Sequence, residues 1–325
     1  MNYLILFDPD GTATMRLILE HGISPSNVYV WDNMPTHLPL LRLLSDRYKF
    51  NVIEQDLFKE KIDMKFDEIL SNPPYDDGMY VKTMKLLPNL LKEDGEFQFL
   101  VPNKILIPYT KGATFAKKSL HIDRIDLTYG SSFVDSIEGT WVCNVVGGLG
   151  KTVDKFPLVL PNGDVVETDF DSPNPVMEMN PTDFTLHNKV MRNDNKFVMH
   201  KKQKIDVKYF VYIRPTAKRV NNKLRYHGVA NEMVDGLENG FYQECNSAEQ
   251  AERMLKIYTE SELFRYISYC NIGFTMISRF NKEFLPNIED CCYNSEQDVY
   301  DFFSITEEEK EHIRGVLAKK RNKHH

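Results

Sequence analysis

Residues 66–75 read Phe-Asp-Glu-Ile-Leu-Ser-Asn-Pro-Pro-Tyr, and this stretch decides how the rest of the chain is interpreted. Its first half is a short apolar run, which predicts a strand over 66–70. The two prolines that follow fix φ and remove two backbone donors, so the chain must leave the strand as a stiff loop. Asn72 adds an amide that can accept hydrogen bonds, and Tyr75 adds an aromatic face. The loop can therefore bind a planar amino group, although the same residues are also compatible with an ordinary turn.

Strand-like and helix-like runs alternate through the first half of the chain. The predicted strands are 2–7, 27–31, 49–53, 66–70, 96–101, 122–128 and 139–146. The predicted helices are 12–21, 35–44 and 79–91, the last kinked at Pro88 and ended by Gly95. This alternation is typical of an α/β fold with a parallel, doubly wound sheet.

Four successive predicted strands are closed by a polar residue, namely Asp8, Asp32, Asp56 and Asn72. Each could be a helix cap by itself. In doubly wound sheets, however, ligands bind beyond the carboxyl ends of the strands. Four polar residues at that edge favour a binding site over four separate caps.

This order and spacing resemble the S-adenosylmethionine-dependent N6-adenine DNA methyltransferases with an Asn-Pro-Pro-Tyr loop, over about residues 3–150. The resemblance implies a Rossmann-like methyltransferase sheet and S-adenosyl-L-methionine as cofactor. It implies that a flipped-out adenine is methylated at N6 in a specific DNA sequence. The clamp for that base would be Asn72, Pro73, Pro74 and Tyr75, and no metal is implied.

The same resemblance assigns the cofactor contacts. Asp32 would bind the ribose of the cofactor, and Asp56 would accept its adenine amino group. Leu57 or Phe58 would pack on the adenine ring.

The first loop departs from the family pattern. Residues 7–14 read Phe-Asp-Pro-Asp-Gly-Thr-Ala-Thr, with Gly11 as the single glycine and Ala13 where a second would fall. Counting back from Gly11 puts Phe7, not Asp8, in the acid position of the pattern. The resemblance assigns cofactor contacts in this loop to Phe7, Asp8, Gly11 and Ala13. The family's upstream segment, which helps to hold the methionine end, has no room in the residues before this loop.

The charge of the chain is unevenly distributed. The net charge is −7 over 325 residues, yet residues 187–226 hold twelve Lys or Arg and two acids. Such a local surplus is typical of a surface that binds phosphate backbones, although a solvated basic face has the same composition. We expect DNA contacts from Lys196, Lys201, Lys202, Lys204, Arg214, Lys218 and Arg219.

The length predicts about two domains. We expect an S-adenosylmethionine-dependent catalytic domain at 1–150, a hairpin around Asn162-Gly163 with a linker at 151–181, and an α+β DNA target-recognition domain at 182–325.

The last region should contain a strand over 208–214, a helix over 247–267 and a final helix that opens with a capping box at Thr306. Its pattern Leu-Pro…Tyr-x-x-Phe…Thr-x-x-Glu, in 285–309, resembles the target-recognition region of restriction–modification adenine methyltransferases. That resemblance implies double-stranded DNA and a cognate restriction endonuclease as partners.

The composition indicates in which cellular compartment the protein is expected. The five cysteines form no CxxC pair, which favours reduced thiols and a cytoplasmic protein. No apolar run approaches the roughly 20 residues that span a bilayer, so no membrane partner is expected. The nine histidines show no metal-ligand spacing.

Two other functions stay open. Amino-methyltransferases that act on RNA or on protein glutamine also carry an Asn-Pro-Pro-Tyr loop. The poor glycine content of residues 7–14 is also compatible with a catalytically weakened, DNA-binding relative.

Overall fold

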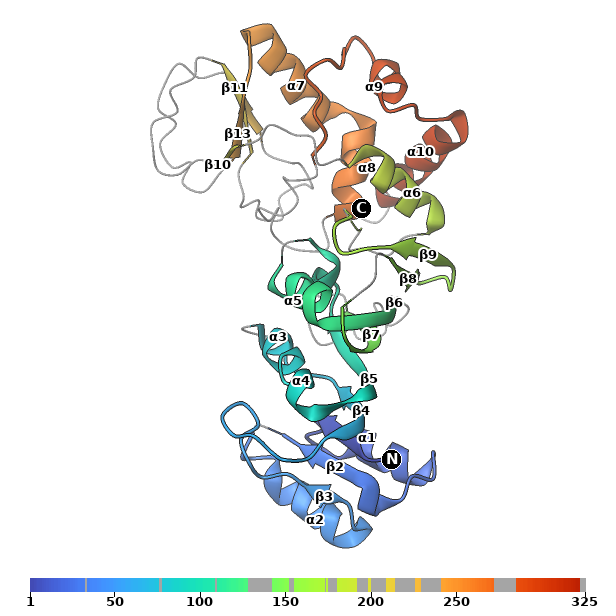
Figure 1. The fold of residues 1–325 in the computed structure, drawn as a ribbon. Coiled ribbons are helices and arrows are strands. Elements are labelled where there is room, and N and C mark those ends of the chain that lie inside the picture. Colours follow the sequence, from blue (N-terminus) through green and yellow to red (C-terminus); the bar gives the residue numbers. More distant parts are fainter. Residues whose placement is uncertain are drawn as a thin grey trace. The chain divides into compact units, whose positions relative to one another are not determined.

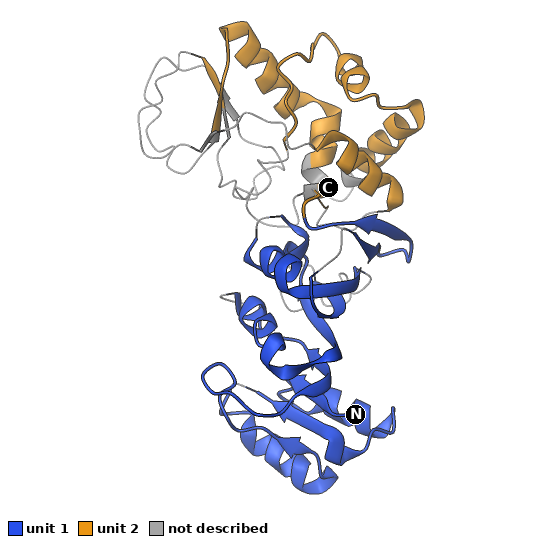
Figure 2. Cartoon of the chain, in the orientation of Figure 1, with its two compact units in different colours: residues 1–136, 141–170 blue, residues 137–140, 171–325 orange. Residues whose placement is uncertain are grey.

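The computed structural model describes residues 1–32, 34–75, 78–108, 110–127, 142–151, 155–172, 174, 180–191, 198–199, 209–213, 226–228, 241–271 and 285–321. The chain divides into two compact units (Figures 1 and 2). Unit 1 comprises residues 1–136 and 141–170, and unit 2 comprises residues 137–140 and 171–325.

Unit 1 is built on one mixed sheet. Among the described residues its strands lie in the order β3-β2-β1-β4-β5-β7-β6-β8-β9. Their bounds are β1 Tyr3–Leu6, β2 Val28–Trp31, β3 Asn51–Val52, β4 Phe66–Ser71, β5 Leu91–Pro102, β6 Leu120–Asp126, β7 Val142–Leu149, β8 Phe156–Val159 and β9 Val165–Thr168. Pairing from β3 through β5 is parallel, and β7 runs antiparallel to both β5 and β6. The predicted Rossmann-like, doubly wound α/β fold is confirmed.

Helices lie between β1 and β2, β2 and β3, β4 and β5, and β5 and β6 (Figure 1). They are α1 Thr12–Leu19, α2 Leu38–Tyr48, α3 Met79–Met84, α4 Leu87–Leu90 and α5 Lys111–Ser119, with 3-10 turns η1 Pro25–Asn27 and η3 Asn103–Leu106. Helices α1 and α2 share one apolar cluster with β1 and β2, centred on the buried residues Ile5, Val30 and Leu41. Burying these side chains stabilises the strand ends that carry the candidate site.

The predicted helix over 79–91 is wrong in its extent. It is two short helices, α3 and α4, and β5 already begins at Leu91. Gly95 lies inside β5 instead of ending a helix. A Cβ at Gly95 would stand 2.9 Å from the backbone oxygen of Asp67 in β4, so the glycine allows the two strands to approach. A local reading of the glycine as a helix stop could not reveal that neighbour.

The predicted hairpin around Asn162-Gly163 is formed by β8 and β9, which pair antiparallel. Gly163 has φ of 89°, a value that favours glycine. Strand β8 also pairs in parallel with β6. The hairpin therefore extends the sheet of unit 1, and this unit continues to Phe170.

Unit 2 combines helices with a small antiparallel sheet. Its described helices are α6 Pro181–Val190, α7 Ala248–Glu260, α8 Glu262–Asn271, α9 Glu296–Phe302 and α10 Glu307–Arg321. Its described strands are β10 Val198–Met199, β11 Phe210–Ile213, β12 Tyr226–Gly228 and β13 Phe241–Glu244, in the order β10-β13-β11-β12. Strand β11 agrees with the strand predicted over 208–214.

The predicted helix over 247–267 is broken at Ser261, which has ψ of 136°. The hydroxyl of Ser261 donates to Glu296 Oε1 (2.7 Å), and the same carboxylate accepts the backbone N–H of Leu263 (3.1 Å). Glu296 thus satisfies the first turn of α8 from a distant part of the chain, which a local helix prediction cannot anticipate.

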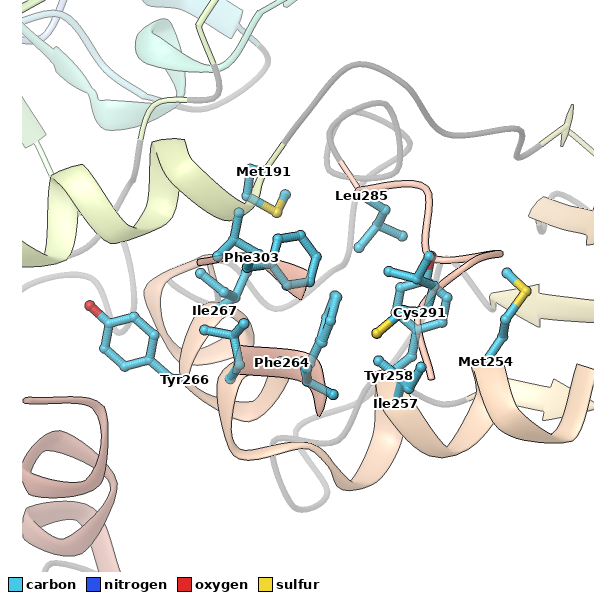
Figure 3. Close-up of a cluster of buried hydrophobic side chains, with 14 of the residues drawn as sticks. Met191, Met254, Ile257, Tyr258, Phe264, Tyr266, Ile267, Leu285, Cys291 and Phe303 are labelled. Carbon is cyan, nitrogen blue, oxygen red and sulfur yellow. The ribbon is translucent and has the colours of Figure 1, made fainter. Parts of the chain in front are cut away.

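The residues that suggested target recognition lie in the core of unit 2. Leu285, Tyr300 and Phe303 are 4%, 1% and 1% exposed. Figure 3 shows Leu285 and Phe303 among the buried side chains of α7 and α8, including Phe264. Their spacing is explained by packing. The capping box at Thr306 is confirmed, because its hydroxyl accepts the N–H of Glu309 and its N–H donates to the Glu309 carboxylate.

Three helices of unit 2 meet at the carboxylate of Asp183 in α6, which is 9% exposed. Its Oδ1 accepts the hydroxyl of Tyr266 from α8 and contacts Nε2 of His312 from α10. Its Oδ2 accepts the N–H of Asn180, which caps α6. Burial raises the pKa of the Tyr266 hydroxyl, so this group stays a donor.

Replacing Asp183 by alanine should lower the free energy of unfolding by about 1–3 kcal/mol, because the buried Tyr266 hydroxyl loses its acceptor. Denaturant unfolding of the full chain measures this loss. Glu311→Ala, which removes an exposed carboxylate from α10, is the matched control and should leave the midpoint unchanged. Equal midpoints for both variants would contradict a stabilising role for Asp183.

Candidate functional site

The loops that carry the predicted site residues start at one level of the sheet. Leu6, the last residue of β1, pairs with Trp31 in β2 and with Ser71 in β4. The chain leaves β1 toward β2 on one side, and β4 lies on the other side of β1. This reversal of strand order is a topological switch point, where doubly wound sheets bind ligands.

The Asn72–Tyr75 loop follows β4 directly at this edge. Asn72 is exposed, Pro73 is buried and Tyr75 is half-buried. The hydroxyl of Tyr75 donates to Oδ1 of Asn72 at 2.8 Å. Burial raises the pKa of Tyr75 to about 12, so its hydroxyl remains a donor at neutral pH. The bond uses one acceptor position of Asn72 Oδ1 and leaves the second for a substrate amine.

Asp8 follows the strand β1 but faces the start of α1. It is 4% exposed, and its Oδ1 accepts the N–H of Ala13 (3.1 Å). Its Oδ2 accepts both the N–H (2.9 Å) and the hydroxyl (2.6 Å) of Thr14. Both oxygens of Asp8 thus satisfy the first turn of α1, which is the capping role.

Gly11 is explained by the fold of the same loop. It has φ of 73°, and a Cβ there would stand 2.6 Å from the side chain of Leu44 in α2. Phe7 has φ of 64°, an uncommon conformation for a bulky residue that often accompanies a functional constraint.

Asp32 is buried at the end of β2, with 7% exposure. Its Oδ1 accepts the N–H of Met34 (2.8 Å) and contacts Nδ1 of His37 (2.9 Å). The acid is therefore held in one orientation, as a ligand-binding carboxylate requires.

Asp56 lies after β3 and is partly exposed. Its Oδ1 accepts the N–H of Phe58 (3.0 Å), and its Oδ2 pairs with the 81% exposed Lys59 (2.8 Å). The hydrogen bonds from Lys59 and from Phe58 hold the pKa of Asp56 below its ordinary value, so it is ionised at neutral pH. Leu57 is buried and Phe58 is half-buried, so of the two Phe58 has more surface free for a ligand.

Sequence reasoning missed two residues at this edge. The sequence predicts Trp31 only as the end of a strand, yet in the structure it contacts the loops after β1 and β3. The sequence predicts Ser71 only as the start of the loop. Its hydroxyl is buried and has no hydrogen-bond partner in the described part of the chain. A tryptophan directly before an acid at a strand end was a usable signal, whereas nothing in the sequence marked Ser71.

A buried hydroxyl without a partner destabilises the fold, so we expect Ser71→Ala to raise the free energy of unfolding by about 1 kcal/mol. If the hydroxyl serves a bound ligand, affinity for that ligand should fall in the same variant. Thermal unfolding and ligand binding would be measured side by side, with Thr83→Ala as a control. Thr83 in α3 is also buried, but its hydroxyl donates to the backbone oxygen of Met79, so its removal should destabilise. A loss of stability in Ser71→Ala would contradict this prediction.

The predicted DNA contacts lie outside the described residues. They are Lys196, Lys201, Lys202, Lys204, Arg214, Lys218 and Arg219. Of the same basic segment, Lys189 is described and pairs with Glu309 at 2.8 Å.

Two further searches cover the described residues only. No group of three His, Cys, Asp or Glu side chains converges there on a metal position. None of the helices described is long and apolar enough to cross a membrane.

The sheet order and the loop at its switch point define an α/β protein whose carboxyl edge carries the candidate site. No protein-family model and no curated protein matches the chain. Solved structures resemble part of it. A modification subunit of a putative type I restriction enzyme from Vibrio vulnificus is 10% identical, with a TM-score of 0.39 over 49% of this chain and 42% of that one.

A type I restriction-modification methyltransferase subunit from Streptococcus thermophilus is 12% identical, with a TM-score of 0.39 over 49% of this chain and 42% of that one. A TehB-like SAM-dependent methyltransferase from Corynebacterium glutamicum is 13% identical, with a TM-score of 0.33 over 46% and 80% of the two chains. The matched region thus spans less than half of the type I subunits.

Proposed function

We propose that this protein is an S-adenosylmethionine-dependent methyltransferase that acts on the N6 amino group of adenine in DNA. The observation that carries the proposal is the Asn72–Tyr75 loop, which leaves β4 beside β1 at the switch point of the sheet. An exposed amide oxygen and a half-buried aromatic ring in one loop suit a planar aromatic amine.

The adenosine half of the cofactor fits the residues present. Asp32 and Asp56 offer carboxylates at adjacent strand ends for ribose hydroxyls and an adenine amino group, and Phe58 offers a ring face. When bound, S-adenosyl-L-methionine supplies an electrophilic methyl group; an amine that takes it would release one proton to water, while the sulfonium becomes a thioether. The methionine half has fewer groups to bind, because Asp8 already accepts the N–H groups of Ala13 and Thr14 in the first turn of α1.

The chain's own residues prepare the amine. Oδ1 of Asn72 and the carbonyl of Pro73 would accept its two hydrogens, which favours a pyramidal nitrogen with a directed lone pair. Tyr75 would stack on the base. An asparagine is not a base at neutral pH, so these residues act by positioning and electrostatics.

Unit 1 would then be catalytic, and unit 2 would recognise the DNA sequence. The basic segment 187–226 supports this division, since phosphate contacts from Lys and Arg position a protein on a duplex. Double-stranded DNA is the proposed substrate, and a cognate restriction endonuclease is a candidate partner.

A second candidate is a catalytically weakened relative that binds DNA. The capping role of Asp8 and the single glycine of the first loop favour it, because neither leaves groups for the methionine end.

Transfer of labelled methyl groups tests the proposal. Duplex DNA, RNA and protein are offered separately, and we expect label in adenine of duplex DNA alone. Label in RNA or in protein glutamine would show that the substrate is another amino group and would contradict the proposed DNA substrate. Calorimetry with S-adenosylmethionine separates the second candidate, which predicts DNA binding without cofactor affinity.

A further inference from the structure

We propose that Trp31 is the positioning residue of the cofactor site. Its contacts hold the loops of Asp8, Asp32 and Asp56 in fixed positions relative to one another. This inference rests on the proposed function. It deepens that function, because it concerns how the residues that would receive the cofactor are kept in place.

The first contact is through the backbone. Trp31 is the last residue of β2 and is 2% exposed. Its carbonyl oxygen accepts the N–H of Phe7 at 2.8 Å. Phe7 is held at φ of 64°, a conformation that a bulky residue adopts only when its surroundings impose it. This backbone bond joins the start of the Asp8 loop to the end of β2, directly beside the indole.

The second contact is through the indole. Its Nε1–H donates to the backbone oxygen of Gln55 at 2.8 Å, and Gln55 directly precedes Asp56. The ladder on this side is short, because β3 consists of Asn51 and Val52. The two backbone pairs of β3 with β2 therefore hold less of the loop than a long strand would. The indole bond adds a fixed point next to Asp56.

The third contact is between rings. The Trp31 ring meets Phe7 edge-on at a centroid distance of 5.3 Å and meets Phe58 in the same way at 5.2 Å. Phe58 is the ring proposed to pack on the cofactor adenine. One side chain thus links the first loop to the adenine-binding loop, and Asp32 is its neighbour in the chain.

Burial alone does not explain these contacts. Tyr29 lies two residues earlier in β2 and also makes an edge-on ring contact, with Phe66 at 5.3 Å. That contact joins two strands, whereas the side-chain contacts of Trp31 described above reach Phe7, Gln55 and Phe58, which all follow strand ends. Tyr29 is therefore the matched control.

Trp31→Phe tests the inference, since it keeps a ring and removes the indole N–H. Calorimetry should show cofactor affinity lower by about 2- to 10-fold, as expected for one lost hydrogen bond. Hydrogen exchange should become faster at the amides of Phe7 and Phe58 without cofactor. Tyr29→Leu should lower thermal stability but leave affinity and these amides unchanged.

A second measurement needs no change at Trp31. The sequence has two tryptophans, so Trp141→Phe leaves Trp31 as the single one. Its emission should change on titration with S-adenosylmethionine, with the dissociation constant that calorimetry gives.

Unchanged affinity in Trp31→Phe would overturn the inference, as would an equal loss in Tyr29→Leu or unaltered emission at saturation. Absence of cofactor binding by the unsubstituted protein would overturn the proposed function and this role together. Cofactor binding by the unsubstituted protein therefore distinguishes failure of the proposed function from failure of the Trp31 role alone.

Discussion

Asn72→Ala should lower the rate constant of methyl transfer by about 10²- to 10³-fold, the usual cost of removing one preorganised hydrogen-bonding group at a reacting centre. The alanine has no oxygen to accept a hydrogen of the substrate amine, so the nitrogen lone pair is no longer directed. Asn72 is exposed and lies outside β4, so the fold should persist. Single-turnover transfer of labelled methyl groups to duplex DNA measures the effect.

Asn89→Ala is the matched control for Asn72, since Asn89 is an exposed asparagine of α4 in the same unit. It should transfer at the unsubstituted rate. Thermal unfolding and cofactor affinity should be unchanged in both variants. A rate for Asn72→Ala within the error of the Asn89→Ala rate would refute the clamp.

Tyr75→Ala should raise the KM for DNA by about 10- to 100-fold, because base–aromatic stacking contributes on the order of 1–3 kcal/mol. The half-buried ring is the part of Tyr75 that would contact the base. Affinity for S-adenosylmethionine should be retained, since the proposed cofactor contacts lie after β1, β2 and β3. Binding of duplex DNA that carries a mismatched target adenine measures the same contact without catalysis.

Tyr75→Phe separates the ring from the hydroxyl. It keeps the stacking surface and removes only the bond to Asn72 Oδ1. Transfer should stay within about threefold of the unsubstituted rate, because one exposed hydrogen bond contributes little. If Tyr75→Phe reduced methyl transfer as much as Tyr75→Ala, the hydroxyl and not the ring would be the functional part of Tyr75. The stacking role would then be wrong.

The predictive features of the sequence were local ones. Apolar runs of strand length located β1, β2 and β4, and two prolines defined the loop after Ser71. These features depend on residues within one element, so the chain order is enough to read them. Element ends were less predictable, as Gly95 and Ser261 show, because each is decided by a residue from another element.

Tertiary structure decided which polar groups at the strand ends already have hydrogen-bond partners within the protein. The sequence placed Asp8 and Asp32 in one row of strand-end acids. In the fold, both oxygens of Asp8 cap α1, whereas Asp32 uses Oδ1 for its contacts with Met34 and His37. A carboxylate at a strand end can bind a ligand or a helix, and only the position of α1 decides between them.

By itself the sequence determined the α/β alternation, the polar strand ends and the stiff Asn72–Tyr75 loop, because propensity and proline geometry act within a few residues. Only the tertiary structure brought Ser71 beside Leu6 at the switch point, and only it gave Trp31 its contacts with Phe7 and Gln55. These partners are far apart in the chain. Their pairing follows from the sheet order, which no local pattern contains.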